Sequence, residues 1–103
     1  MVLAEFTMFP TDKGESVSAY VAPILDVIDR SRITYQLTPM STILEGSWKE
    51  VMSVISECFE TMFSQSARIS ISINIDYRRG VESRMKSKTD KIEKILKRKL
   101  RTA

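Results

Sequence analysis

Hydrophobic and polar residues alternate without a break along residues 68–77, RISISINIDY. Side chains of a β-strand point to opposite faces in turn, so this pattern predicts a strand with one apolar face and one polar face. We expect helices of the same chain to cover the apolar face. The polar face carries hydroxyls, an amide and a carboxylate. It can serve as solvated surface, as the floor of a polar ligand site, or as a subunit contact.

The first thirty residues predict a strand followed by a helix. Apolar residues alternate with others over residues 2–9, and a proline ends the strand. Apolar positions then recur at helical spacing, with Ser16 or Ser18 as the N-cap. Pro23 lies inside this pattern, so we expect the helix to begin late or to bend there.

The middle of the chain predicts a hairpin and a second helix. Two short strands, residues 33–38 and 41–45, flank a Pro-Met break. Ser47 and the glutamate three residues later have the spacing of a capping box, which starts a helix over residues 48–64. Its apolar residues share one face, and we interpret Trp48 among them as a core residue.

Residues 82–101 predict a basic helix with a narrow apolar stripe. The element order is therefore β-α-β-β-α-β followed by a helix. This order is typical of an α+β, ferredoxin-like fold, in which two helices cover one face of a four-stranded antiparallel sheet. We divide the chain into a ferredoxin-like domain, residues 1–81, and a C-terminal basic helix, residues 82–103. That helix is part of the same domain or an oligomerisation element.

Composition excludes several classes of enzyme and binding site. The chain of 103 residues forms one domain, with no histidine, one cysteine and three isolated glycines. These counts exclude imidazole catalysis, zinc clusters and Gly-rich phosphate loops. Cys58 follows Glu57, whose charge raises the pKa of a thiol, so we interpret Cys58 as a small core or interface residue. We expect no catalytic residue, no metal and no cofactor.

The sequence also predicts a location. No apolar run approaches the roughly 20 residues of a membrane span, so we expect no membrane partner. The N-terminal residues, MVLAEFTMFP, lack the basic start of a secretory signal. Together with the single cysteine, these features indicate the cytoplasm.

Charge is divided unevenly along the chain. Residues 78–103 carry eleven basic and three acidic side chains, whereas residues 1–77 carry five basic and ten acidic ones. The acidic body can therefore complement its own tail or that of a neighbour, which favours self-association. A nucleic-acid-binding module that uses the basic helix is a weaker alternative. Single-strand binders of similar topology present aromatic residues on the sheet face, and residues 68–77 present small polar ones there.

Four segments, taken in order, resemble those of a known family. They are FTMFP (6–10), SVSAY (16–20), YQLTPMSTILEG (35–46) and INIDYRRG (73–80). Together they span essentially the whole chain and are similar to the MTH1187/YkoF-like thiamine-binding group, the UPF0045 or DUF77 proteins. The resemblance implies a ferredoxin-like fold and dimers that pair through their sheets, often as dimers of dimers. It also implies that some members bind thiamine or its hydroxymethylpyrimidine half without transforming it.

The resemblance also points to ligand-binding residues. The family's STxLxG-type strand falls on residues 41–46, and its aspartate after the last strand falls on Asp76. Ser41 and Thr42 each offer a donor and an acceptor, which suits the mixed edge of an aminopyrimidine, although both residues are equally compatible with a plain hairpin. The carboxylate of Glu45 can pair with the aminopyrimidine or the thiazolium, or simply favour the start of the next helix.

Two further side chains complete the candidate set. Arg78 can hold a phosphate or carboxylate, or form an ion pair between subunits. Tyr20 can stack on a flat ring. The candidate ligand-binding residues are Ser41, Thr42, Glu45, Asp76, Arg78 and Tyr20.

The hypothesis that follows is a non-catalytic, cytoplasmic small-molecule binding protein. Its ligand is thiamine or the hydroxymethylpyrimidine moiety, and its site lies near a subunit interface. We expect a homo-oligomer, a dimer at minimum and a tetramer by preference, with the basic helix in a subunit contact. The alternative is a structural or regulatory homo-oligomer without a ligand.

Overall fold

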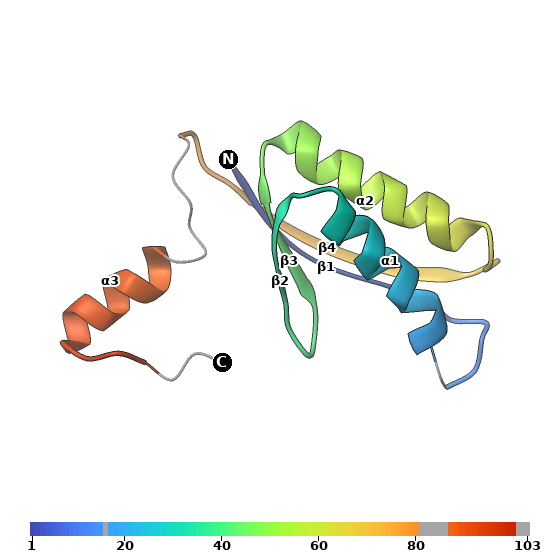
Figure 1. The fold of residues 1–103 in the computed structure, drawn as a ribbon, viewed down its shortest axis with the longest axis horizontal. Coiled ribbons are helices and arrows are strands. Elements are labelled where there is room, and N and C mark those ends of the chain that lie inside the picture. The colour runs from blue at the N-terminus through green and yellow to red at the C-terminus, as the bar shows by residue number, and fades with distance from the viewer. Residues whose placement is uncertain (16, 81–86, 101–103) are drawn as a thin grey trace.

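The computed structural model describes residues 1–15, 17–80 and 87–100, leaving aside the side chains of residues 87–89. Its four strands form one antiparallel sheet in the order β2-β3-β1-β4, with α1 and α2 on the same face (Figure 1). This arrangement confirms the predicted ferredoxin-like α+β fold. The elements are β1 (Val2–Pro10), α1 (Ser18–Arg30), β2 (Thr34–Leu37), β3 (Thr42–Gly46), α2 (Trp48–Phe63), β4 (Ile69–Tyr77) and α3 (Ser87–Leu96).

The two helix starts differ. At α2 the Ser47 hydroxyl accepts from the backbone N–H of Glu50, and the Glu50 carboxylate accepts from the backbone N–H of Ser47, which confirms the capping box. The N-cap of α1 is Val17, whose side chain cannot accept a hydrogen bond, so Ser18 as the cap was wrong. Ser16 lies outside the described residues. The late start was wrong too, because α1 begins before Pro23 and continues past it.

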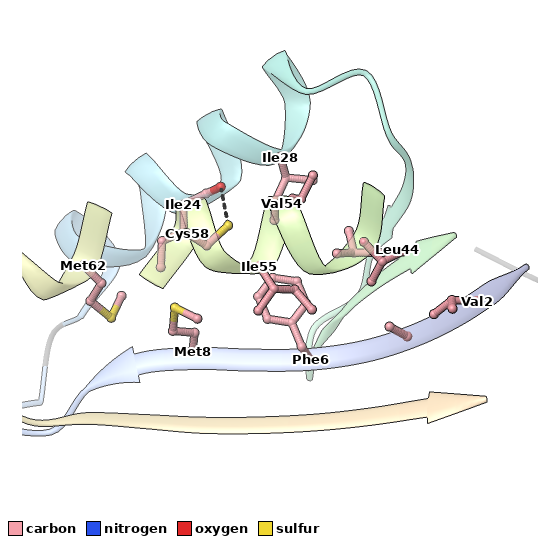
Figure 2. Close-up of a cluster of buried hydrophobic side chains, with 12 residues drawn as sticks. Val2, Phe6, Met8, Ile24, Ile28, Leu44, Val54, Ile55, Cys58 and Met62 are labelled. Carbon is pink, nitrogen blue, oxygen red and sulfur yellow. Dashed lines mark hydrogen bonds between the residues drawn. The ribbon is translucent and has the colours of Figure 1, made fainter. Parts of the chain in front are cut away.

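The core lies between the sheet and the two helices (Figure 2). Every second residue of β1 from Val2 to Met8 is buried against it, as the alternating pattern predicts. Cys58 of α2 is fully buried and its Sγ donates to the carbonyl of Ile24 on α1 at 3.8 Å. Burial raises the pKa of the Cys58 thiol to about 12, and the charge of Glu57 adds to the effect. Cys58 is therefore a core residue, as predicted.

The apolar face of β4 is only partly covered, contrary to the prediction. Ile71, Ile73 and Ile75 stand opposite Met8, Phe6 and Ala4 of β1 and so share the face that carries the helices. They nevertheless remain 41, 37 and 37% exposed. These isoleucines stay exposed because β4 is an edge strand of the sheet, and the residues of α2 lie over β1 and β3 instead. Trp48 of α2 is 56% exposed, so its interpretation as a core residue was also wrong.

The end of β4 is held by the start of the chain. The amino group of Met1 donates to the carbonyls of Arg78 (2.6 Å) and Gly80 (3.1 Å), and Gly80 has a φ of +124°, which favours glycine. Beyond it, α3 stands apart from the sheet and from the other helices (Figure 1). Of the described part of the predicted basic helix, residues 87–96 are helical and residues 97–100 are not, so the helix ends earlier than predicted, at Leu96, and Lys97 has a φ of +57°. Residues 82–86 and 101 lie outside the described residues.

Candidate functional site

A cavity of about 340 Å³ opens between α1 and the hairpin of β2 and β3. Phe6 and Met8 of β1 form its base, Val21 and Leu25 of α1 form one wall, and residues 37–42 of the hairpin form the other. None of the described residues that line it carries a charge. An apolar cavity with a few polar groups is typical of a site for a small organic molecule.

Thr42 supplies the polar group that distinguishes this cavity from ordinary core. The residue is only 7% exposed and lines the cavity from the first position of β3. No hydrogen bond among the described residues involves its hydroxyl, although its backbone pairs in the sheet. A buried hydroxyl without a partner costs roughly 1–3 kcal/mol. A polar group of a bound molecule would remove that cost.

The hairpin turn holds a second hydroxyl at the edge of the cavity. Thr38 Oγ1 donates to the carbonyl of Ser41 and accepts from the Ser41 N–H, at 2.9 and 3.0 Å. Ser41 Oγ donates to Oε2 of Glu5 at 2.9 Å, so it keeps lone pairs that can accept. Met40, at the tip of the hairpin, is 83% exposed and also lines the cavity.

Glu45 and Asp76 lie on the other face of the sheet. Both stand opposite Leu3 of β1, one from each side, so they occupy one row across three strands. Glu45 is buried and Asp76 is exposed. Two shallow hollows of about 220 and 330 Å³ lie on this open face, and Glu5 and Asn74 line both.

The structure therefore divides the predicted ligand-binding residues into separate groups. Thr42 lines the cavity, and Glu45 and Asp76 belong to the open face. Ser41 borders both the cavity and the smaller hollow of the open face, and its hydroxyl donates to Glu5 on that face. Arg78 follows β4, where its backbone pairs with Met1. The ring of Tyr20 lies 5.7 Å from Nζ of Lys13 and packs against the core.

Sequence reasoning missed the apolar lining of the cavity. Phe6, Val21 and Leu25 have the periodicity of core residues, and in the structure they also line the cavity. Periodicity shows which face of an element is buried, but it does not show where the buried faces of two elements fail to touch and leave a cavity. No signal in the sequence alone could have separated these residues from the rest of the core.

The comparisons with known proteins decide the family. The sequence profile described as "Thiamine-binding protein" matches residues 4–93 of this chain. The chain belongs to the thiamine-binding protein family. A member from Bacillus subtilis, the UPF0045 protein YqgV, is 34% identical over 102 residues, covering 93% of this chain and 98% of the relative. This confirms the resemblance drawn from the four segments.

Solved structures of similar proteins have the same fold. The crystal structure of MJ1052 from Methanocaldococcus jannaschii has a TM-score of 0.79 and 31% identity, covering 88% of this chain and 94% of the other. A Thermotoga maritima protein, provisionally assigned to thiamine biosynthesis or salvage, has a TM-score of 0.76 at 20% identity, covering 88% and 97%. Within the described residues, no helix of this family member is long and apolar enough to cross a membrane.

Proposed function

We propose that this protein binds thiamine or its hydroxymethylpyrimidine moiety in the cavity between α1 and the hairpin, without transforming it. The observation that carries the proposal is the buried hydroxyl of Thr42, which faces an uncharged cavity and has no hydrogen-bond partner among the described residues. Membership of the thiamine-binding family supports this choice of ligand class.

The cavity suits the chemistry of an aminopyrimidine. The ring is flat and carries a methyl group, so Phe6, Met8 and Leu25 supply matching apolar contact. Its ring nitrogens accept hydrogen bonds and its exocyclic amine donates them. The hydroxyl of Thr42 can meet either need, because a hydroxyl both donates and accepts.

The same lining disfavours phosphorylated forms of the vitamin. A phosphate that enters an apolar cavity loses its hydration, and no charged side chain lines the described part of the cavity to replace it. We therefore expect hydroxymethylpyrimidine and thiamine to bind more tightly than their phosphate esters.

Titration calorimetry of the folded protein with thiamine, hydroxymethylpyrimidine and thiamine phosphates tests the proposal. Thr42→Val keeps the shape of the side chain and removes the hydroxyl, so we expect affinity to fall about tenfold, the equivalent of one hydrogen bond of roughly 1–1.5 kcal/mol. Thr34→Val is the matched control, because Thr34 is an exposed threonine in the neighbouring strand and does not line the cavity. If Thr42→Val and Thr34→Val bind the compounds with equal affinity, the ligand does not lie in the cavity beside Thr42.

The open face provides the competing location for a ligand. If Asp76→Asn or Glu5→Gln abolishes binding while Thr42→Val does not, the ligand lies in the hollows lined by these carboxylates. No heat and no thermal shift with any of the compounds would favour the homo-oligomer without a ligand. Chromatography of thiamine before and after incubation checks that the protein leaves it unchanged.

A further inference from the structure

The methionines of the described chain differ sharply in exposure. Met40, at the tip of the hairpin between β2 and β3, is 83% exposed. Met8 and Met62 belong to the core and are 5 and 2% exposed, and Met52 is partly buried against the same core. Because oxidation of a sulfur side chain by peroxide depends on its exposure, Met40 is the described methionine that an oxidant reaches most easily.

Cys58, the one cysteine of the sequence, does not compete for the oxidant. Its side chain is fully buried, and burial raises the pKa of its thiol to about 12. The thiolate is the form of cysteine that reacts, and a thiol with so high a pKa forms very little of it at neutral pH. Peroxide at low concentration therefore acts on methionine rather than on cysteine in this protein.

Met40 lies between two spaces of different polarity. It lines the cavity between α1 and the hairpin, together with the exposed apolar side chains of Phe9 and Leu37. It also lines the smaller hollow of the open face, together with Ser72 and Asn74. A thioether is apolar and suits the cavity. The hydroxyl and the amide can donate hydrogen bonds to a polar group, which the hollow therefore suits better.

The hairpin turn holds the backbone of Met40 in place. The N–H of Met40 donates to Thr38 Oγ1 at 3.3 Å, and the N–H of Thr38 donates to the carbonyl of Ser41 at 2.9 Å. Pro39 restricts φ at the position between them. A chemical change at the sulfur therefore acts through the side chain, whose three rotatable bonds allow it to turn toward either space.

We propose that Met40 is an oxidation site that controls binding of the ligand in the cavity, an inference that rests on the proposed function. One oxygen atom of hydrogen peroxide is transferred to the sulfur: the O–O bond breaks, an S–O bond forms, the sulfur is oxidised and the other oxygen leaves as water. The sulfoxide is polar and accepts hydrogen bonds. It turns from the cavity to the hollow, where Ser72 and Asn74 donate to it.

The change of position weakens binding, because the ligand loses the apolar contact of the thioether. The contact between a methionine sulfur and a flat aromatic ring corresponds to about a twofold to tenfold change in affinity. The effect is reversible. Methionine sulfoxide reductases remove the oxygen as water while two thiols are oxidised to a disulfide.

Titration calorimetry with thiamine and with hydroxymethylpyrimidine, before and after mild treatment with hydrogen peroxide that is then removed, tests the proposal. In the parent protein, Met40 should gain one oxygen before Met8 and Met62 do, as measured by peptide mass spectrometry. Affinity should fall by about twofold to tenfold and return after incubation with methionine sulfoxide reductases. Saturating hydroxymethylpyrimidine should slow the oxidation of Met40, because it covers part of the thioether.

Two variants assign the effect to one sulfur. Met40→Leu stays apolar and has no sulfur at this position, so treatment should not change its affinity. Met52→Leu is the matched control, because Met52 packs against the core and does not line the cavity. Treatment should weaken binding by Met52→Leu as it weakens binding by the parent. Met85, which lies outside the described residues, is present in both variants, so its oxidation affects them equally.

The outcomes separate this inference from the proposed function. A parent whose Met40 is oxidised and whose affinity is unchanged would overturn the inference and leave the proposed function intact. The same holds if the core methionines are oxidised first, if treatment weakens binding by Met40→Leu as much as by the parent, or if the reductases do not restore the affinity. If the untreated parent binds neither compound, the proposed function fails and the inference fails with it.

Discussion

The carboxylate of Asp12 joins the loop that follows β1 to the loop between α2 and β4. Asp12, in the loop after β1, accepts from the Ser66 hydroxyl at 2.6 Å and from the Ala67 N–H at 3.0 Å. Ser66 and Ala67 lie between α2 and β4, so the contact spans more than fifty positions of sequence. These hydrogen bonds, that of Ser66 first, lower the pKa of Asp12.

The lowered pKa predicts how stability responds to acid. A carboxyl group with a lower pKa in the folded state contributes stability above its unfolded pKa of about 3.9, and the contribution is lost as pH falls through the folded pKa. We expect Asp12→Asn to melt at a lower temperature than the parent at pH 7 and the difference to shrink below about pH 4. Melting curves between pH 2.5 and pH 7 measure it. Glu15→Gln is the control, because Glu15 is an exposed acid in the same loop; a gap that stays constant with pH would contradict the prediction.

The elements follow their local sequence closely at α2 and less closely at α1. The spacing of Ser47 and Glu50 predicts both halves of the capping box, because the hydrogen bonds involved connect neighbouring residues. At α1, helical apolar spacing and contact with α2 outweigh the missing side-chain cap and the internal Pro23. Local signals decide an element's end when tertiary packing does not oppose them.

Removing the cap of α2 should be measurable. Ser47→Ala deletes the hydroxyl that accepts from the Glu50 N–H, and we expect it to lower the free energy of unfolding by about 1 kcal/mol. Urea denaturation followed by circular dichroism measures the change. Ser53→Ala, at an exposed position inside the same helix, should leave stability unchanged or slightly raise it, because alanine is the better helix former. Similar losses from both variants would show that the cap contributes nothing.

At the scale of the whole molecule, α3 has an apolar stripe with no cover among the described residues. Ile92 and Leu96 are each about half exposed, and the helix stands apart from the rest of the chain (Figure 1). Its basic face and the acidic body make a subunit contact electrostatically favourable.

Replacing Ile92, Leu96 and Leu100 together by serine should lower the oligomeric state or the melting temperature. The three side chains lose their apolar surface, which is worth roughly 1.5–3 kcal/mol each when fully buried. Sedimentation and thermal denaturation measure the result. Ile92→Leu, Leu96→Met and Leu100→Met together form the control, because they keep both the apolar surface and the basic side chains of this segment. A monomeric parent at micromolar concentration would refute the subunit contact.

The order of elements, the fold class and the faces of each strand were determined by the sequence itself. The alternation in β1 and β4 and the helical spacing in α2 predict which side chains share a face, because strand and helix periods are properties of the local backbone. The family was also within reach, since four short segments resembled it in order.

Only the tertiary structure decided what covers each face and where space is left. The same alternation occurs in β1 and β4, yet Phe6 is buried and Ile73 is exposed, because β1 lies inside the sheet and β4 at its edge. Thr42 borders a cavity while Glu45, three residues on, lies on the opposite face of the sheet. Burial and cavities depend on how elements distant in sequence pack against one another. The periodicity of a single strand or helix carries no information about this packing.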